Sequence, residues 1–322
     1  LITIGDRSVG GLTHRDQMIG PWQVPVADCA VTMMDYQGYQ GEAMAMGERS
    51  PIAIYNSAAA ARMSVSEAVT NIFSADISEI SDLKLSANWM AACGTEGEDV
   101  KLYEAVKAVG MELCPALGIS IPVGKDSLSM RSQWQADDQK KSVTSPVSLI
   151  ISAFAPVSDV RKTLTPLLQK NPDTELIFID LGLQENRMGG SVLSQITNQE
   201  ESNCPDLASP DLLIRFTKAV TALKNEQLIL AYHDRSDGGL FASLCEMAFC
   251  SRVGLSINID LLVMEKGHES DYGDAKNWAS QISGRRDEST IKALFNEELG
   301  VVIQIHRQQR DQVFSHLRQF GL

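Results

Sequence analysis

One short segment, residues 228–249, constrains the fold of this chain more than any other. It opens with an apolar, β-rich run at residues 228–232 and closes with an apolar run of helical period at residues 240–249. Between them lies an acidic turn that ends in Gly238 and Gly239. This order predicts a strand, a tight turn and a helix that begins at the two glycines.

The acidic turn points to a ligand that carries phosphate. Free N–H groups at the start of a helix attract phosphate, but Asp234 and Asp237 would repel it, so a bridging cation such as Mg²⁺ reconciles the two. A similar acidic turn at residues 6–12 contains Gly10 and Gly11. Two distant copies indicate two elements that meet at phosphate-bearing ligands. The alternative is a pair of ordinary turns, because Asp, Ser and Gly are common turn and capping residues.

The composition is that of a globular protein and excludes several classes of function. The net charge of −13 leaves no broad basic surface for nucleic acid. No apolar run reaches the roughly 18 residues of a membrane span, and no signal peptide opens the chain. The six cysteines form no C-x-x-C pair and, with the five histidines, show no zinc spacing. We therefore expect reduced thiols in a cytoplasmic protein, with neither nucleic acid nor a membrane as partner.

Length and element order predict two domains. A chain of 322 residues is long for one hydrophobic core. Expected helices and strands alternate throughout, which predicts an α/β fold of mixed α+β layers. The polar residues 135–142 are the best candidate for a linker or hairpin tip, so we divide the chain into 1–145 and 146–322. Because it begins at Leu1 without methionine, we also expect it to be part of a longer polypeptide.

Several shorter segments carry specific expectations. Residues 41–48 are expected to form a short helix capped by glycine, and residues 52–55 a strand. A strand at residues 119–123 is expected to lead into a turn that presents Lys125 and Ser127 to phosphate.

The clearest predicted helix covers residues 57–73 and offers two oxygen ligands. Glu67 and Asn71 stand four residues apart, so both side chains leave the same helix face. A carboxylate and an amide oxygen in that arrangement suit a hard cation. Asp28 offers a further carboxylate at the entrance of a predicted strand at residues 28–34. The alternative for Glu67 and Asn71 is a solvated surface pair.

Recognisable motifs run through nearly the whole chain. They are ITIGDRSVGG, DQMIGPWQVPVADCAV, GEAMAMGER, SEAVTNI, KLSANWMAA, GEDVKLYEAVKAVG, IPVGKDSLSM, HDRSDGGL, EMAF and LFNEELG. This set resembles formylglycinamide ribonucleotide amidotransferase (phosphoribosylformylglycinamidine synthase) in its long, single-chain bacterial form. The chain departs from the family pattern near residues 263–289, a polar stretch that we interpret as a variable insertion on the surface.

The resemblance implies a fold and an activity. The fold would be a two-domain half of a core like that of aminoimidazole ribonucleotide synthetase. The complete enzyme of this family is an ATP-dependent ligase of purine biosynthesis. It converts formylglycinamide ribonucleotide (FGAR) to its amidine, using Mg²⁺ and ammonia released from glutamine.

The chain matches the second half of that synthetase core. A first synthetase half and a glutaminase domain of the same polypeptide are therefore its expected partners. The family's catalytic histidine and glutaminase triad belong to those other parts, so we expect no catalytic residue here and an inactive isolated fragment.

The resemblance also implies an auxiliary magnesium–nucleotide site in this half, with ATP or ADP and Mg²⁺ as cofactors. Its metal ligands fall on Asp28, Glu67, Asn71 and Asp234. The expected nucleotide and phosphate contacts are Ala27, Ser236, Gly238, Gly239, Lys125 and Ser127. All four metal ligands are oxygen donors, which Mg²⁺ prefers. His233 is expected to pack or to form hydrogen bonds, because adjacent strand residues point to opposite faces.

Two other functions remain open on the sequence. The chain can be a structural module whose bound nucleotide is never turned over, or an independent kinase-like enzyme of the same superfamily. An isolated half is also expected to expose an apolar sheet face, including residues 30–34 and 83–89, and to pair as a homodimer.

Overall fold

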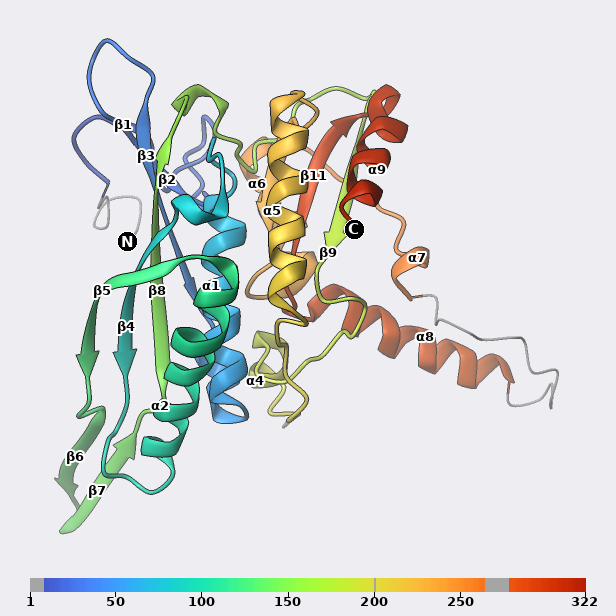
Figure 1. Cartoon of the computed structure of the whole chain (residues 1–322). Helices are drawn as coiled ribbons and strands as arrows, with labels where there is room; N and C mark the ends of the chain where they lie inside the picture. Colours follow the sequence, from blue (N-terminus) through green and yellow to red (C-terminus); the bar gives the residue numbers. More distant parts are fainter. Residues whose placement is uncertain (1–8, 200, 264–277) are drawn as a thin grey trace.

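The computed structural model describes residues 9–199, 201–263 and 278–322, which form two layered halves (Figure 1). The strands of the first half are β1 (Thr13–Arg15), β2 (Ala30–Met33), β3 (Gly41–Glu48), β4 (Lys84–Met90), β5 (Ser120–Ser127) and β8 (Ser148–Val157). They make one sheet in the order β1-β2-β3-β8-β4-β5. In the second half, β9 (Thr174–Asp180), β10 (Ala231–Asp234) and β11 (Gly300–His306) make an antiparallel sheet in the order β10-β11-β9. The predicted α/β fold of mixed layers is confirmed.

β3 is a strand, where the sequence predicted a short helix. Every second residue is buried, and these residues are small: Gly41, Ala43, Ala45 and Gly47. A period of two is typical of a strand with one buried face, and the small residues concealed it. The helix α1 (Ser57–Ile72) lies directly against them, so that a Cβ at position 47 would collide with the α1 backbone. The helix therefore comes unusually close to the sheet.

The predicted helix at residues 57–73 is confirmed as α1, which lies between the two halves (Figure 1). Asn56 caps its N-terminus by accepting a hydrogen bond from Ala59 N (2.9 Å). Most of its residues are buried. One continuous hydrophobic core includes residues of α1 and of both sheets.

Side chains of the second half satisfy the C-terminal carbonyls of α1. The Tyr232 hydroxyl on β10 donates to Thr70 O (2.6 Å). Lys224, on α5 (Pro210–Asn225), donates from Nζ to Phe73 O (2.8 Å) and to Ala75 O. Because the last four carbonyls of a helix lack partners within the helix, the second half completes the end of α1.

Helices cover both faces of the second sheet. Val301 and Ile303 of β11 belong to the main core, with α5 and α9 (Arg310–Gln319), whereas Val302 belongs to a smaller core with α6 (Gly239–Ser251). α6 follows β10 directly, so the predicted strand–turn–helix is confirmed. None of the helices in the described part of the chain has the length and apolar character needed to cross a membrane.

The expected surface excursion is only partly described. Residues 264–277 lie outside the described residues. The remainder of that stretch is helical, because α8 (Trp278–Phe295) begins there and packs against α6. From residue 278 onward, the described part of the expected insertion is thus a helix.

Two other local expectations are wrong. Residues 52–55 lie in and after a 3₁₀ turn (Ser50–Ile54), and Pro51 at its start favours a helical turn over a strand. Residues 124–127 continue β5 instead of forming a turn. Gly124 is needed there, because a Cβ would lie 2.6 Å from Ala87 O on β4. Residues 98–117 are helical throughout, as α2 (Glu98–Lys107), a π-turn (Ala108–Leu113) and α3 (Cys114–Leu117).

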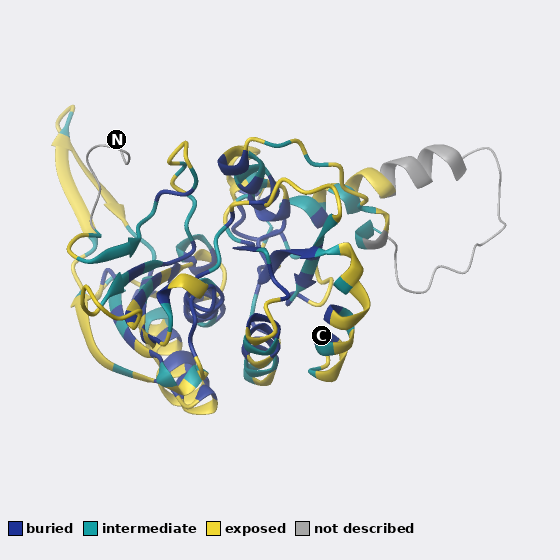
Figure 2. Cartoon of the chain, turned by 90° about the horizontal axis from the view of Figure 1, so that it is seen from above, coloured by how far each residue is buried: buried dark blue, intermediate teal, exposed yellow. Residues whose placement is uncertain are grey.

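The first sheet continues past the predicted domain boundary. β6 (Arg131–Ala136) and β7 (Gln139–Thr144) form the expected hairpin, which is exposed (Figure 2). The chain then returns as β8, which pairs with both β3 and β4. A division at residue 145 would remove this central strand from its sheet. The boundary must therefore lie after β8, between residues 157 and 174.

The face of the first sheet opposite α1 and α2 has no helix of the described chain on it (Figure 1); we call it the open face. Strand alternation and the observed register place apolar side chains there: Met44, Met46, Val123, Ile150 and Phe154. Met46 is 58% exposed and Phe154 42%. An apolar face was expected from residues 30–34 and 83–89, but its larger residues come from β3, β5 and β8.

Candidate metal centre

The predicted metal ligands come from three distant parts of the chain, and Asp28 and Asp234 meet where the two halves pack together. Asp28 precedes β2, Glu67 and Asn71 lie on the last two turns of α1, and Asp234 ends β10. β10 crosses the end of α1, where the hydroxyl of Tyr232 bonds to the helix backbone. The packing of the two halves therefore determines the geometry of this centre.

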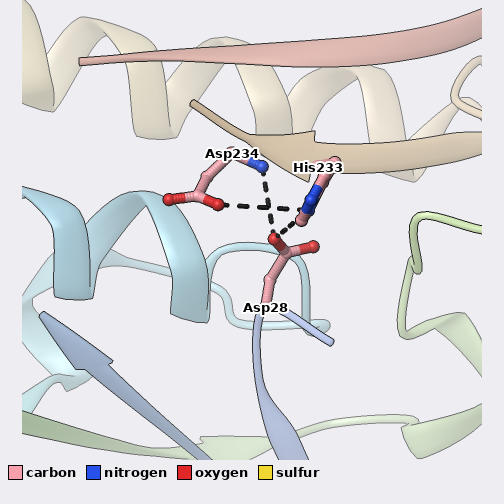
Figure 3. Close-up of side chains that lie close together, drawn as sticks. All are labelled: Asp28, His233 and Asp234. Atoms are coloured by element: carbon pink, nitrogen blue, oxygen red, sulfur yellow. Dashed lines mark hydrogen bonds and ion pairs between the residues drawn. The ribbon is translucent and has the colours of Figure 1, made fainter. Parts of the chain in front are cut away.

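Asp28 is held by two donors from β10 (Figure 3). Its Oδ1 accepts hydrogen bonds from His233 Nδ1 (2.7 Å) and from Asp234 N (3.2 Å). Its Oδ2 is buried and has no hydrogen-bond partner among the described residues. One potential ligand atom from each of these three residues lies within 4.8 Å of the others. One oxygen of Asp28 is thus fixed, and the other is available to a cation.

His233 lies between two carboxylates. Its Nε2 is 2.8 Å from Glu246 Oε2 on α6, opposite the contact with Asp28. Burial alone would lower the pKa of His233, but its contacts with Asp28 and Glu246 raise that pKa well above the usual range. The imidazolium form donates through both nitrogens and keeps no lone pair for a metal. The expected hydrogen bonding of His233 is confirmed, and it positions Asp28. The reason given for it was wrong, because His233 Nδ1 lies only 3.9 Å from Asp234 Oδ1 and the two side chains do not point to opposite faces.

Asp234 contributes a second buried oxygen without a partner. Its Oδ2 has no hydrogen-bond partner in the described part of the structure. Burial raises the pKa of Asp234 well above its usual range, and the charges of Asp28 and Glu67 raise it further. Buried carboxylates this close together are unfavourable unless protons or a cation compensate them.

The backbone of β3 orients the two ligands on α1. Glu67 Oε2 accepts a hydrogen bond from Glu48 N (2.7 Å), and Asn71 Nδ2 donates to Met46 O (3.0 Å). These bonds turn the amide of Asn71 so that its Oδ1 is left buried and unpartnered within the described chain. Burial raises the pKa of Glu67, and the charge of Arg49 opposes that rise. Both side chains leave the same helix face, as predicted.

The donor set fits Mg²⁺. Three buried oxygens, Asp28 Oδ2, Asn71 Oδ1 and Asp234 Oδ2, have no hydrogen-bond partner among the described residues. Buried polar atoms are nearly always paired, so unpaired oxygens of three predicted ligands indicate a missing partner. Glu67 adds a carboxylate, and all four residues supply the hard oxygen donors typical of Mg²⁺ sites.

The two glycines of the acidic turn do not offer free N–H groups. Gly238 N donates to Glu297 Oε1 (2.8 Å), and Gly239 N donates to Ser236 O (2.9 Å). Both glycines have positive φ, +80° and +69°, and a Cβ on Gly239 would lie 2.6 Å from Asn296 O. Their observed role is to form the turn, and the carboxylate of Glu297 takes the place expected for phosphate.

Of the other predicted nucleotide and phosphate contacts, some lie beside the predicted metal ligands and some lie far from them. Ala27 adjoins Asp28 and helps to line a small depression beside it, and Ser236 lies in the turn after β10. Lys125 and Ser127 contact each other (2.6 Å) on β5, at the far edge of the first sheet from β2. The structure does not bring Lys125 and Ser127 to the metal ligands.

Sequence reasoning missed the partners that surround the ligands. Arg49 lies 3.4 Å from Glu67, and Glu297 holds the turn after Asp234. They belong to the GEAMAMGER and LFNEELG motifs, but no regular spacing connects residues so far apart. Only the three-dimensional structure identifies them.

The chain matches two protein-family models. Residues 1–156 match the FGAR-AT PurM_N-like domain, and residues 175–322 match the C-terminal domain of AIR synthase related proteins. The interval between the two matches agrees with the revised boundary after β8.

Solved structures with the same fold include PurL of Thermotoga maritima. Its complex with FGAR is similar over 94% of this chain and 43% of the PurL chain, at 10% sequence identity and a TM-score of 0.63. Its complex with ADP covers 94% and 41%, at 12% identity and a TM-score of 0.58. Hydrogenase maturation protein HypE in complex with ATP covers 89% and 75%, at 14% identity and 0.53. This chain therefore spans less than half of the PurL chains.

Proposed function

Because the chain belongs to the FGAR amidotransferase family, as one half of its synthetase core, we propose that it is part of the ATP-dependent ligase that converts FGAR to its amidine. Glutamine would supply the ammonia through a glutaminase domain, and a first synthetase half would supply the catalytic groups. This half would hold ATP or ADP through Mg²⁺ at Asp28, Glu67, Asn71 and Asp234. The resident nucleotide is the specific contribution of this chain.

The observation that carries the proposal is the set of unpartnered oxygens on Asp28, Asn71 and Asp234. They are buried between the two halves, so a group that binds them also joins the halves. Mg²⁺ retains bonds to phosphate oxygens as well as to protein ligands, which makes a nucleotide phosphate the natural second partner. PurL of Thermotoga maritima has been solved with ATP, ADP and AMPPCP, which supports a nucleotide as the ligand.

The contacts favour a nucleotide that is held and not consumed. When bound, Mg²⁺ would neutralise phosphate charge and bridge the ligand to the protein. Hydrolysis would also need a group that accepts a proton from water, but His233 already donates to two carboxylates. Asp28 and Asp234 would be metal ligands, with their basicity lowered by the cation. Linkage then predicts that the nucleotide stabilises the folded chain.

Isothermal titration with ADP, in the presence and absence of Mg²⁺, tests the site. We expect binding only with Mg²⁺, and a loss of at least tenfold in Glu67→Gln. That substitution keeps an acceptor for Glu48 N but removes the ligand charge. Glu104→Gln on the exposed side of α2 is the matched control and should bind like the wild type. Equal ADP affinity with and without Mg²⁺ would contradict the proposal.

Phosphate release distinguishes a resident nucleotide from a consumed one. We expect no steady ATP turnover by this chain with Mg²⁺, and no amidine when FGAR and free ammonia are added. The mass of any nucleotide released on denaturation should correspond to ADP or ATP. Steady turnover would instead favour the independent kinase-like enzyme.

A further inference from the structure

Arg49 is a buried cation that connects the two halves beside the metal ligands. Its side chain is 2% exposed. Its Nη2 lies 3.4 Å from Glu67 Oε1, and its Nη1 donates to Asp237 Oδ1 at 2.9 Å. The same Nη1 lies 3.7 Å from Glu297 Oε2. One guanidinium therefore faces a predicted metal ligand in the first half and two carboxylates in the second.

Glu297 connects Arg49 to the acidic turn through hydrogen bonds. Its Oε1 accepts hydrogen bonds from Gly238 N and from Val192 N, both at 2.8 Å. The first of these bonds fixes the turn that follows Asp234. The second fixes the start of α4 (Val192–Ile196). Glu297 is itself buried, so its charge needs a cationic partner, and Arg49 is close enough to provide one.

We infer that Arg49 is a positioning residue for the metal centre. It links Glu67, on α1, to the turn that follows Asp234, so that the ligands of both halves are in place before a cation binds. This inference rests on the proposed function. Arginine suits this role because its planar fork reaches several carboxylates in fixed directions, which a lysine ammonium cannot do.

A second arginine provides a matched control. Arg62, also at the first half's side of the junction, forms a bidentate pair with Asp206 of the second half, at 2.7 and 2.6 Å. This pair crosses the same junction with better hydrogen-bond geometry. It contacts neither Glu67 nor the acidic turn in the described structure. Loss of Arg62 therefore reports the effect of weakening the junction alone.

Mn²⁺ affinity distinguishes a residue that positions the metal centre from one that only stabilises the junction. It can be measured by electron paramagnetic resonance, which reports the concentration of free Mn²⁺. We expect Arg49→Met to lower Mn²⁺ affinity at least tenfold and Arg62→Met less than threefold, even if both lower the melting temperature. Removal of a nearby positive charge should by itself raise cation affinity. Unchanged or tighter binding in Arg49→Met would therefore overturn the inference, and so would an equal loss in Arg62→Met. If Arg49→Met does not fold, Arg49→Lys takes its place, with an expected loss of three- to tenfold.

Hydrogen exchange tests the same inference without a cation. In EDTA, amides of residues 234–240 should exchange at least fivefold faster in Arg49→Met than in the wild type. The same amides in Arg62→Met should match the wild type. If the wild type binds no Mn²⁺, the proposed function fails, and exchange still decides whether Arg49 holds the turn. Equal exchange in all three proteins would refute the positioning role.

Discussion

The buried ammonium of Lys224 makes the stability of this chain depend on pH in an unusual direction. Lys224 reaches from α5 to the end of α1, where its Nζ donates to Phe73 O and Ala75 O. Burial lowers the pKa of Lys224 from 10.5 to about 8, and the charge of Asp76 only partly opposes that effect. Between these two values the unfolded chain binds one more proton than the folded chain. The free energy of unfolding should therefore rise with pH.

The size of the effect follows from the lowered pKa. One pKa unit corresponds to about 1.4 kcal/mol, so the full difference is about 3 kcal/mol. The charged ammonium opposes folding by that amount below pH 8, and the penalty disappears by about pH 10.5. Between about pH 7.5 and about pH 10 the expected gain is about 2 kcal/mol. The thiol of Cys29 acts in the opposite direction: burial raises its pKa from 9.0 to about 12, so above about pH 9 its contribution to the free energy of unfolding falls with pH.

Urea denaturation followed by tryptophan fluorescence measures this gain. Other groups titrate in the same range, so the informative quantity is the wild-type free energy of unfolding minus that of Lys224→Met at each pH. We expect this difference to grow by about 2 kcal/mol between about pH 7.5 and about pH 10. Lys218→Met, at an exposed position of the same helix, should give a flat difference. A flat difference for Lys224→Met, or one that falls with pH, would refute the reasoning.

Three further predictions concern packing and assembly. Gly47→Ala should lower the free energy of unfolding, measured by urea denaturation, by at least about 2 kcal/mol, because the added Cβ would collide with the backbone of α1. A loss below about 0.5 kcal/mol would contradict the close packing of α1 on β3. Tyr232→Phe should lower it by about 1–2 kcal/mol in the same assay, because Thr70 O loses its buried donor, and no change would show that this bond is dispensable. The isolated chain should sediment as a dimer that pairs through the open face, and Met46→Glu should make it a monomer; a wild-type monomer at tens of micromolar would count against this pairing.

Three of the four proposed metal ligands stand in a recognisable local pattern of the sequence. Glu67 and Asn71 share one face of a regular helix, and Asp234 follows an apolar strand. Such patterns depend on neighbours within a few residues. Asp28 has less local support, and the family resemblance identified it.

The wrong predictions arose where local patterns were ambiguous or where distant contacts decide the structure. In β3 the buried residues are glycine and alanine, which are also common in and after helices. Buried and exposed positions therefore did not differ clearly in hydrophobicity, and the alternation of a strand was hidden. Gly238 resembled a phosphate-binding glycine because nothing nearby shows that Glu297 accepts its N–H. Arg49 depends on partners nearly 190 and 250 positions away, which no sequence window includes.

Where α1 packs against β3, the rise of one helical turn nearly equals the rise of two strand residues. Four residues of a helix advance about 6.0 Å and two residues of a strand about 6.7 Å. Asn71 bonds to Met46 and Glu67 bonds to Glu48, so one helical turn pairs with one strand dipeptide. Both bonds use the strand backbone, while the side chains of Met46 and Glu48 point to the open face. Mutations can therefore alter that face, and with it the choice of partner, while the ligands stay in register.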